Sequence, residues 1–398
     1  MQVSWLLRGL KGRPSTISML AGPGEVESFG NSTKVSKMKS LLTLILATVS
    51  LYGNAQYPGF EIQGSQVRKL TSTIVANQEY ELHIMLPSGY GNSDKKYPVV
   101  YLMDSQWDFP LVTALYGQQY YDGFVPSVII VGVTWGGTRP NPDSLRARDY
   151  TPTKETSSPQ SGGAATFLAF MEKELFPFVE KNYKADPKDR TLVGCSLGGL
   201  FTLYALFTKP ALFQKYIAAT PAIGWNNEVI YQYEQKYSAT NNNAHAKLFI
   251  CFGGVERGLP GFKKLVKHLS QRNYKHLQIQ SRVLENIGHS GTKGEGYERG
   301  LQYVFGRPSL QMQAPLLKKY VGSYKLSNEK VIETRVENNQ LVLYFSPTNK
   351  YILDAASEAN FYSTAEFLNV SFQQDANKKI NALHIERFGG TQTANKLN

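Results

Sequence analysis

The chain has 398 residues, of which 42% are hydrophobic and 19% are charged, and its formal net charge is +12. This composition excludes a disordered protein, and the length suffices for more than one average domain. Lysine and arginine are scattered without a basic run of five or more, so the charge predicts a solvated basic surface and no nucleic-acid partner.

An export signal begins at Met38 and not at the first residue. Positive charge, an apolar run and small residues follow one another there, at Lys34, Lys37 and Lys39, then 41–51, then 53–55. This order is typical of a secretory signal peptide, and the apolar run is too short to span a membrane. We expect residues 1–37 to be a misassigned upstream extension and 38–55 to be the signal. The mature protein is then expected in the periplasm or outside the cell.

Strands and helices alternate through residues 56–313. Alternating polar and apolar residues predict half-exposed strands at 67–75 and 79–86. Continuous apolar runs predict strands buried on both faces at 97–103 and 128–133. Four more strands are expected at 190–195, 215–219, 247–252 and 277–284, and the clearest helix at 164–183. This alternation predicts an α/β domain with a mostly parallel central sheet flanked by helices.

The pattern changes after Pro308, and residues 314–398 predict a second domain. Short alternating segments recur without an amphipathic helix, at 341–345, 367–372 and 380–388. Turn-forming residues divide them, as at 338–339 and 375–377. We therefore expect a small all-β domain, either a barrel or a sandwich.

A G-x-S-x-G sequence, Gly194-Cys195-Ser196-Leu197-Gly198, lies between an apolar strand and a helical stretch. In this context the pattern is that of a nucleophile elbow, where glycines allow a tight turn and the serine hydroxyl is exposed. The sequence thus predicts Ser196 as the nucleophile in an attack on a carbonyl group.

A serine nucleophile needs a base, and the base needs an orienting carboxylate. His289 is the only one of the six histidines in the loop after 277–284, the last predicted strand of the α/β domain, which is where this fold places its base. Glu256 follows strand 247–252 and is the expected acid. Glu285 remains an alternative, although it shares a connection with His289.

The developing oxyanion requires backbone N–H donors. Leu197, at the start of the helix after the nucleophile, should supply one of them. The second should come from the loop 104–107, with Gln106 as the predicted donor and its neighbour Ser105 as the alternative.

Neither cofactor nor metal is expected. The two cysteines, Cys195 and Cys251, lie in apolar surroundings and predict buried thiols without a disulfide. The histidines are dispersed, and no C-x-x-C or H-E-x-x-H motif occurs.

Residues 60–307 resemble the esterase branch of the α/β-hydrolases, and most closely the siderophore esterases of the enterobactin and bacillibactin type. The resemblance rests on a series of blocks in order: YPVVYLMD, SVIIVGV, RARDYTPT, GCSLGGLFTLYAL, PAIGW, FGGVE and GHS. It implies Ser196 as nucleophile, His289 as base and Glu256 as acid. The tail from Leu317 resembles, more loosely, the small β domain appended to exported serine hydrolases.

The resemblance implies that Arg148 and Trp225 shape the substrate cleft. Trp107, and Arg146 and Arg257 in loops on the predicted active-site side, are further candidate substrate-binding residues. Arginines here, together with Lys293, would attract an anionic substrate such as a ferric catecholate. The alternative, favoured for most of them, is that they are ordinary loop charges and that Arg148 pairs structurally with Asp149.

Three departures from the family pattern stand out. Cys195 replaces a histidine, Ser105 replaces a glycine, and the block PAIGW is less aromatic than usual.

The expected function is that of an exported serine esterase acting through an acyl-enzyme, with a siderophore trilactone as the possible substrate. Feruloyl or acetyl-xylan esters linked to polysaccharide are the alternative substrates. An acyltransferase, or a non-catalytic binding protein that uses the β domain, are alternatives of another class. No membrane-spanning segment is expected in the mature chain.

Overall fold

The computed structural model describes residues 61–397 except 93, 241–244, 365 and 388–389. The predicted extension, 1–37, and the predicted signal, 38–55, lie outside the described residues. Across the described ranges, no helix combines the length and the apolar character that a membrane crossing requires.

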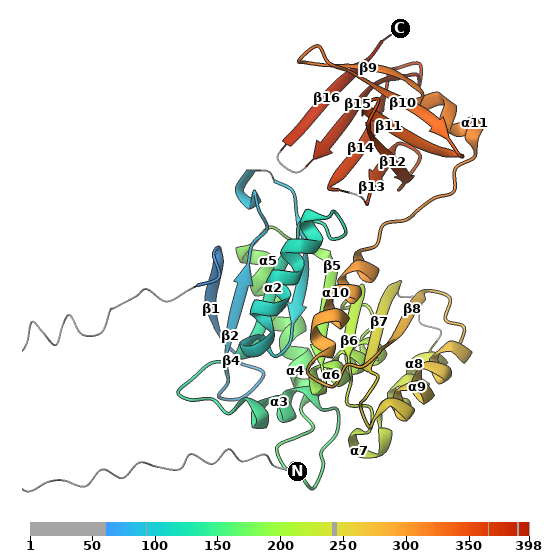
Figure 1. Cartoon of the computed structure of the whole chain (residues 1–398). Helices are drawn as coiled ribbons and strands as arrows, with labels where there is room; N and C mark the ends of the chain where they lie inside the picture. The colour runs from blue at the N-terminus through green and yellow to red at the C-terminus, as the bar shows by residue number, and fades with distance from the viewer. Residues whose placement is uncertain (1–60, 93, 241–244, 365, 388–389, 398) are drawn as a thin grey trace, which may run out of the picture. The chain divides into compact units, whose positions relative to one another are not determined.

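Eight strands form one sheet in the order β1-β2-β4-β3-β5-β6-β7-β8 (Figure 1). Their bounds are β1 Ser65–Thr71, β2 Glu79–Met85, β3 Tyr97–Leu102, β4 Ile129–Trp135, β5 Ala185–Cys195, β6 Lys215–Ala219, β7 Ala246–Gly253 and β8 Leu277–Leu284. The pairs β1–β2 and β2–β4 are antiparallel, and all other pairs are parallel. The predicted mostly parallel sheet is confirmed.

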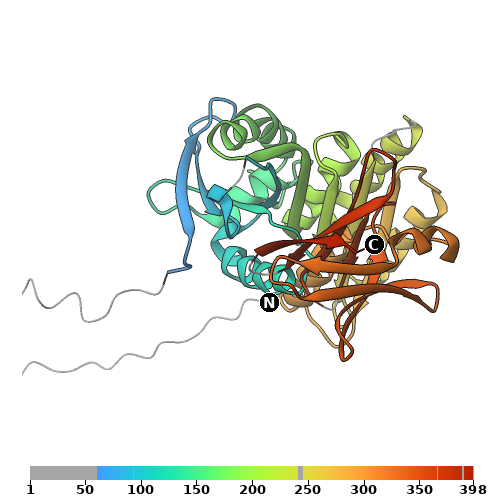
Figure 2. The same ribbon diagram turned by 90° about the horizontal axis from the view of Figure 1, so that it is seen from above.

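Helices cover both faces of this sheet (Figures 1 and 2). One face carries α2 and α10, whose apolar residues share a core with the strands. The other face carries most of the remaining helices. The bounds in this part of the chain are η1 Tyr90–Asn92, α2 Ser105–Tyr121, α3 Pro142–Tyr150, α4 Ala164–Phe170, η2 Met171–Leu175, α5 Phe176–Asn182, α6 Leu197–Thr208, α7 Trp225–Glu228, α8 Ile230–Ala239, α9 Leu259–Gln271 and α10 Thr292–Phe305.

Burial on both faces explains the sequence of the central strands. Every residue of β4, IIVGVTW, is buried, as expected for a strand between two helical layers. The edge strand β1 is mostly exposed and ends at Thr71, before the predicted end at Val75. The reason is a local turn, in which the Ser72 hydroxyl oxygen accepts the backbone N–H groups of Ile74 and Val75.

The second part of the chain is a closed antiparallel barrel in the order β10-β11-β12-β13-β14-β15-β16-β9. This decides the prediction between barrel and sandwich in favour of the barrel. Its strands are β9 Gly322–Leu326, β10 Val331–Glu337, β11 Gln340–Ser346, β12 Asn349–Ala355, β13 Asn360–Ser363, β14 Leu368–Gln374, β15 Ile380–Arg387 and β16 Gly390–Lys396. Two short helices, α11 Ala314–Leu317 and η3 Lys318–Tyr320, precede it.

Candidate active site

Ser196 lies at the turn between β5 and α6 with an unusual backbone conformation, φ 58° and ψ −116°. A non-glycine residue with positive φ is strained and persists only where the surroundings fix it. Gly194 shows how tight the turn is, because a Cβ atom there would lie 2.3 Å from the carbonyl oxygen of Gly198. The Ser196 N–H donates to the carbonyl of Ala219 at 3.1 Å, which anchors the turn to the neighbouring strand β6.

His289 and Glu256 form a hydrogen-bonded pair across two loops. His289 Nδ1 lies 2.6 Å from Glu256 Oε2. The other carboxylate oxygen, Oε1, accepts the N–H of Gly253 at 2.9 Å and the hydroxyl of Thr220. Three partners therefore fix the carboxylate, and the His289 side chain, 52% exposed, stays accessible.

Ser196, Glu256 and His289 line one cavity of about 290 Å³. The structure thus brings together the three residues that the chain order selected from loops far apart in sequence. Glu256, and not the alternative Glu285, is the carboxylate bonded to His289. Thr220, which lines the same cavity, was missed by the sequence reasoning, although its place directly after β6 could have indicated it.

The loop before α2 is held in place by buried polar contacts. Asp104 has a left-handed backbone, φ 55°, and its N–H donates to the hydroxyl of Tyr150 at 3.1 Å. Arg146 donates two hydrogen bonds to the Asp104 carboxylate, at 3.1 and 2.8 Å. Burial raises the pKa of this carboxyl group, and Arg146 opposes the shift. The start of α2 is therefore a fixed point of the site.

Ser105 starts a chain of side chains that leads away from the site. Its hydroxyl lies 2.8 Å from His83 Nδ1, and His83 Nε2 lies 3.1 Å from Glu81 Oε1. The Ser105 side chain packs so closely on β4 that a Cβ atom at Gly132 would fall 2.0 Å from its oxygen. Ser105 is 1% exposed, so its hydroxyl depends on His83 for a partner.

The two predicted sources of oxyanion donors are both helix starts. Leu197 is the first residue of α6, and Ser105 and Gln106 are the first two of α2. Such residues have no carbonyl within their own helix to receive their N–H groups. The Gln106 side chain accepts a hydrogen bond from Thr134 at 2.7 Å, and its buried Nε2 has no partner among the described residues. Both predicted sources of oxyanion donors thus have the required local structure.

The cavity around Ser196 is lined by none of the predicted substrate-binding residues, Trp107, Arg146, Arg148, Trp225 and Arg257. Arg148 and Trp225 have structural partners instead. Arg148 donates to Asp149, as the structural alternative expected, and also to Gln78. The buried Asp149 carboxylate further accepts from Tyr80 at 2.8 Å and Trp135 at 2.7 Å. The Trp225 indole N–H donates to the carbonyl of Thr153 at 3.1 Å, which fixes the loop after α3.

Trp107 is the exposed aromatic residue at the start of α2, and 48% of its surface is accessible. Two cations flank its ring, with the Arg146 guanidinium at 5.6 Å and the Lys293 ammonium at 6.0 Å from the ring centre. Lys293 is itself paired with the buried Asp108 at 2.6 Å. Arg257 is exposed, and no hydrogen bond or ion pair to its side chain is found in the described part of the chain.

Cys195 sits directly before the nucleophile and is buried, as predicted, with 1% exposure. Burial raises the pKa of its thiol to about 12. Cys251 is likewise a free, buried thiol. Neither thiol forms a disulfide in the structure.

A family model described as "Putative esterase" matches residues 72–289, more than half of the chain. Among curated proteins, the chain is 34% identical over 263 residues to "Ferri-bacillibactin esterase BesA" of Bacillus subtilis, covering 62% of this chain and 89% of that protein. It is 30% identical over 220 residues to "Siderophore enterobactin esterase" of Emericella nidulans, covering 49% of this chain and 73% of that protein.

Solved structures show the same similarity. The BES protein from Bacillus cereus superposes with a TM-score of 0.57 at 29% identity, covering 63% of this chain and 98% of that chain. An IroE-like serine hydrolase from Shewanella oneidensis gives a TM-score of 0.54 at 27% identity, covering 61% and 80%.

Proposed function

Because the chain belongs to this esterase family of the α/β-hydrolases, we propose that it hydrolyses carboxylic esters through an acyl-enzyme on Ser196. The observation that carries the proposal is the shared cavity, in which Ser196 lies with a histidine already bonded to a carboxylate. A serine, a base and an orienting acid are the groups that acyl transfer requires.

The reaction follows from the roles of these groups. Ser196 Oγ attacks the ester carbonyl while His289 Nε2 accepts the hydroxyl proton, and Glu256 stabilises the imidazolium through Nδ1. The bond to the alcohol oxygen then breaks, and His289 returns the proton to the leaving alcohol. Water repeats the sequence on the acyl-enzyme and releases the acid.

The tetrahedral intermediate carries a negative charge that needs donors fixed in advance. The N–H of Leu197 supplies one, aided by the positive end of α6. The N–H of Gln106, or of its neighbour Ser105, supplies the second from the start of α2. Loss of one such donor costs about 10²- to 10³-fold in kcat in comparable enzymes.

For the substrate we propose an anionic siderophore ester. Two relatives carry names of siderophore esterases, and two cations lie 5.6 and 6.0 Å from the centre of the exposed Trp107 ring. A planar aromatic ligand can stack on such a ring while its negative charge meets the flanking cations. Arg146 and Lys293 are already paired with buried carboxylates, so Arg257 is the exposed cation whose charge can be changed without breaking a pair.

The proposed export of the protein rests on the sequence of residues 38–55. N-terminal sequencing of protein expressed from Met38 tests it. A start near Gln56 in the material outside the cytoplasm is the expected result, and retention of the full segment would contradict it.

The function is tested by comparing the protein from Gln56 onward with its Ser196→Ala variant on a panel of esters. The panel contains p-nitrophenyl butyrate, methyl ferulate, acetylated xylan, and enterobactin with and without iron. We expect turnover that depends on Ser196 and is best on the trilactone. Best turnover on ferulate or xylan would replace the siderophore assignment, and no turnover by a folded protein would refute ester hydrolysis.

The charge of the substrate is tested with Arg257→Glu. We expect slower turnover of anionic esters and unchanged turnover of neutral ones. Equal loss on both classes would show that Arg257 does not select for charge.

A further inference from the structure

The closed barrel is filled by side chains at one end. Four aromatic rings pack together there, with centroids 4.6 to 6.0 Å apart, from Tyr320, Tyr324, Phe361 and Phe372. Eight-stranded barrels are just wide enough to be filled in this way or to hold one small ligand. This barrel combines both, because side chains fill one end and the other end is open.

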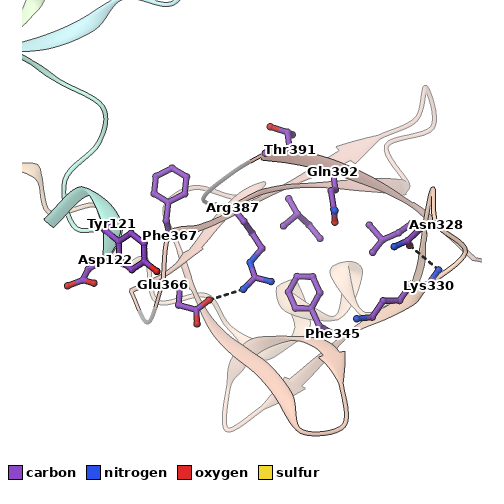
Figure 3. A pocket seen from close by; sticks show the side chains of 13 residues that line it. Tyr121, Asp122, Asn328, Lys330, Phe345, Glu366, Phe367, Arg387, Thr391 and Gln392 are labelled. Carbon is purple, nitrogen blue, oxygen red and sulfur yellow. Dashed lines mark hydrogen bonds and ion pairs between the residues drawn. The ribbon is translucent and has the colours of Figure 1, made fainter. Parts of the chain in front are cut away.

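A cavity of about 820 Å³ lies at that other end (Figure 3). It is much larger than the cavity of about 290 Å³ around Ser196 and has the size of a small-molecule site. Apart from Gly390, the barrel residues that line it are of two kinds, the apolar Leu326, Phe345, Phe367 and Ile385 and the polar Asn328, Lys330, Glu366, Arg387, Thr391 and Gln392. Such a lining fits a ligand with an apolar body and a polar head.

Arg387 points into the barrel. Ile385 and Leu383, two and four residues before it on β15, belong to the barrel core, so alternation places Arg387 on the same face. Figure 3 shows its side chain directed into the cavity toward Phe345. An inward-facing cation in a barrel is costly unless it has partners or a ligand.

The guanidinium of Arg387 is only partly used by the protein. It lies 4.9 Å from the ring centre of Phe345 and 5.2 Å from that of Tyr351. Its Nη2 donates both to Glu366 at 2.8 Å and to the Tyr351 hydroxyl at 2.7 Å. No bond from Nε or Nη1 is found within the described chain. Stacking and one ion pair thus fix the group while leaving donors available.

Lys330 adds a second cation to the cavity. Its side chain extends from the β9–β10 turn toward Phe345 in Figure 3. Its ammonium group forms no ion pair or hydrogen bond with any residue that the structure describes. The cavity lining thus holds two cations, Lys330 and Arg387, and two carboxylates, Asp122 at the end of α2 and Glu366, which pairs with Arg387, so Lys330 is the cation left for a ligand.

We propose that the barrel binds a small amphipathic carboxylate, an organic acid with a compact apolar body. Its carboxylate meets the ammonium of Lys330 and the free edge of Arg387, in charge-assisted hydrogen bonds. Its apolar body packs on Leu326, Phe345 and Ile385. The site is separate from the residues proposed for ester hydrolysis and does not depend on them.

The test is calorimetric titration of the full chain with octanoate and with hydrocinnamate, each beside its neutral amide. We expect both acids, or the one whose body fits, to bind at least tenfold more tightly than the amide. Lys330→Gln and Arg387→Gln should each weaken acid binding about tenfold, the usual size for a charge-assisted hydrogen bond.

Arg335→Gln is the matched control. Arg335 also stacks on a tyrosine, Tyr344 at 4.7 Å, and pairs with a glutamate, Glu333, but it is exposed and absent from the cavity lining. It should leave acid binding unchanged. Thermal unfolding checks that each variant folds. If Arg387→Gln unfolds the barrel, acid binding is measured on Lys330→Gln and Arg387→Lys instead.

Three results would overturn the proposal. They are equal affinity for acid and amide, no measurable binding of either acid at millimolar concentration, and unchanged acid binding in a folded Lys330→Gln variant.

Discussion

Replacement of His83 by alanine should slow the chemical step without weakening substrate binding. His83 lies on β2 and does not line the cavity around Ser196. It acts through Ser105, whose hydroxyl oxygen lies 2.8 Å from His83 Nδ1. Ser105 is the first residue of α2, the helix that supplies the proposed oxyanion donor. His83 is therefore a positioning residue. Its loss should slow the chemical step, in which the donor stabilises the oxyanion.

The magnitude follows from the burial of Ser105. Its hydroxyl is 1% exposed, so removal of His83 leaves a buried polar group without its partner, at a cost of about 1–3 kcal/mol. The α2 start can relieve that cost by moving, and displacements of about 1 Å in a catalytic group cost about 10²-fold in rate. We expect kcat on p-nitrophenyl butyrate to fall by about 10- to 100-fold, while KM changes little.

The assay is a double-mutant cycle of His83→Ala, Ser105→Ala and the combination. Removal of both partners leaves no unpaired group, so the double variant should lose less activity than the product of the two single losses. His83→Gln, which keeps a hydrogen-bonding group, should restore part of the rate. Multiplicative losses, or a His83→Ala variant with lower stability and unchanged kcat, would refute the reasoning.

Three further predictions concern the nucleophile turn, the acid and a buried carboxylate. Gly194→Ala should prevent folding or lower Tm strongly, because its Cβ would lie 2.3 Å from a backbone oxygen; a normal melting curve would contradict this. Glu256→Gln should lower kcat by about 10³- to 10⁴-fold with KM unchanged, measured by steady-state kinetics; a loss below tenfold would leave the role of acid unfilled. Burial alone would raise the pKa of Glu234, but hydrogen bonds from Arg272, Tyr274 and His268 outweigh it and lower the pKa. The stability that this carboxylate contributes is therefore present above the ordinary glutamate pKa of about 4.3 and is lost as pH falls through the lowered value. Tm measured against pH should show this acid loss, and Glu234→Gln should be less stable at neutral pH and lose less on acidification.

Much of the site could be predicted because local rules place its parts. The elbow requires glycines at fixed spacing, and parallel strands bring their following loops to one edge of the sheet. Ser196 and His289 could therefore be selected from motif and chain order alone. The choice between Glu256 and Glu285 stayed open, because each follows a strand, β7 or β8, and only the hydrogen bond of His289 to Glu256 distinguishes them.

The roles of individual arginines and aromatics could not be predicted in this way. Arg148 and Trp225 form contacts with residues far along the chain, at Gln78 and Thr153, which no local pattern indicates. The pairing of Ser105 with His83 likewise depends on the packing of α2 against β2. Side-chain partners of this kind are decided by tertiary structure.

The barrel shows a similar division. Three of its segments could be recognised by alternation, at 341–345, 367–372 and 380–388, and among the described residues they overlap β11, β14 and β15. Its closure depends on β9 pairing with β16, two strands at opposite ends of the domain. Because that pairing is non-local, the sequence left open whether a barrel or a sandwich forms.

Two residues with nucleophilic side chains, Cys195 and Ser196, are adjacent in the elbow, and only the serine is available for reaction. With the Cys195 thiol sealed in the core and its pKa raised to about 12, almost no thiolate exists at neutral pH. Iodoacetamide and mild oxidants should therefore leave the folded enzyme intact, whereas an organophosphate directed at serine should inactivate it. The nucleophile turn of such an enzyme should therefore need no reducing agent in the assay to protect Cys195.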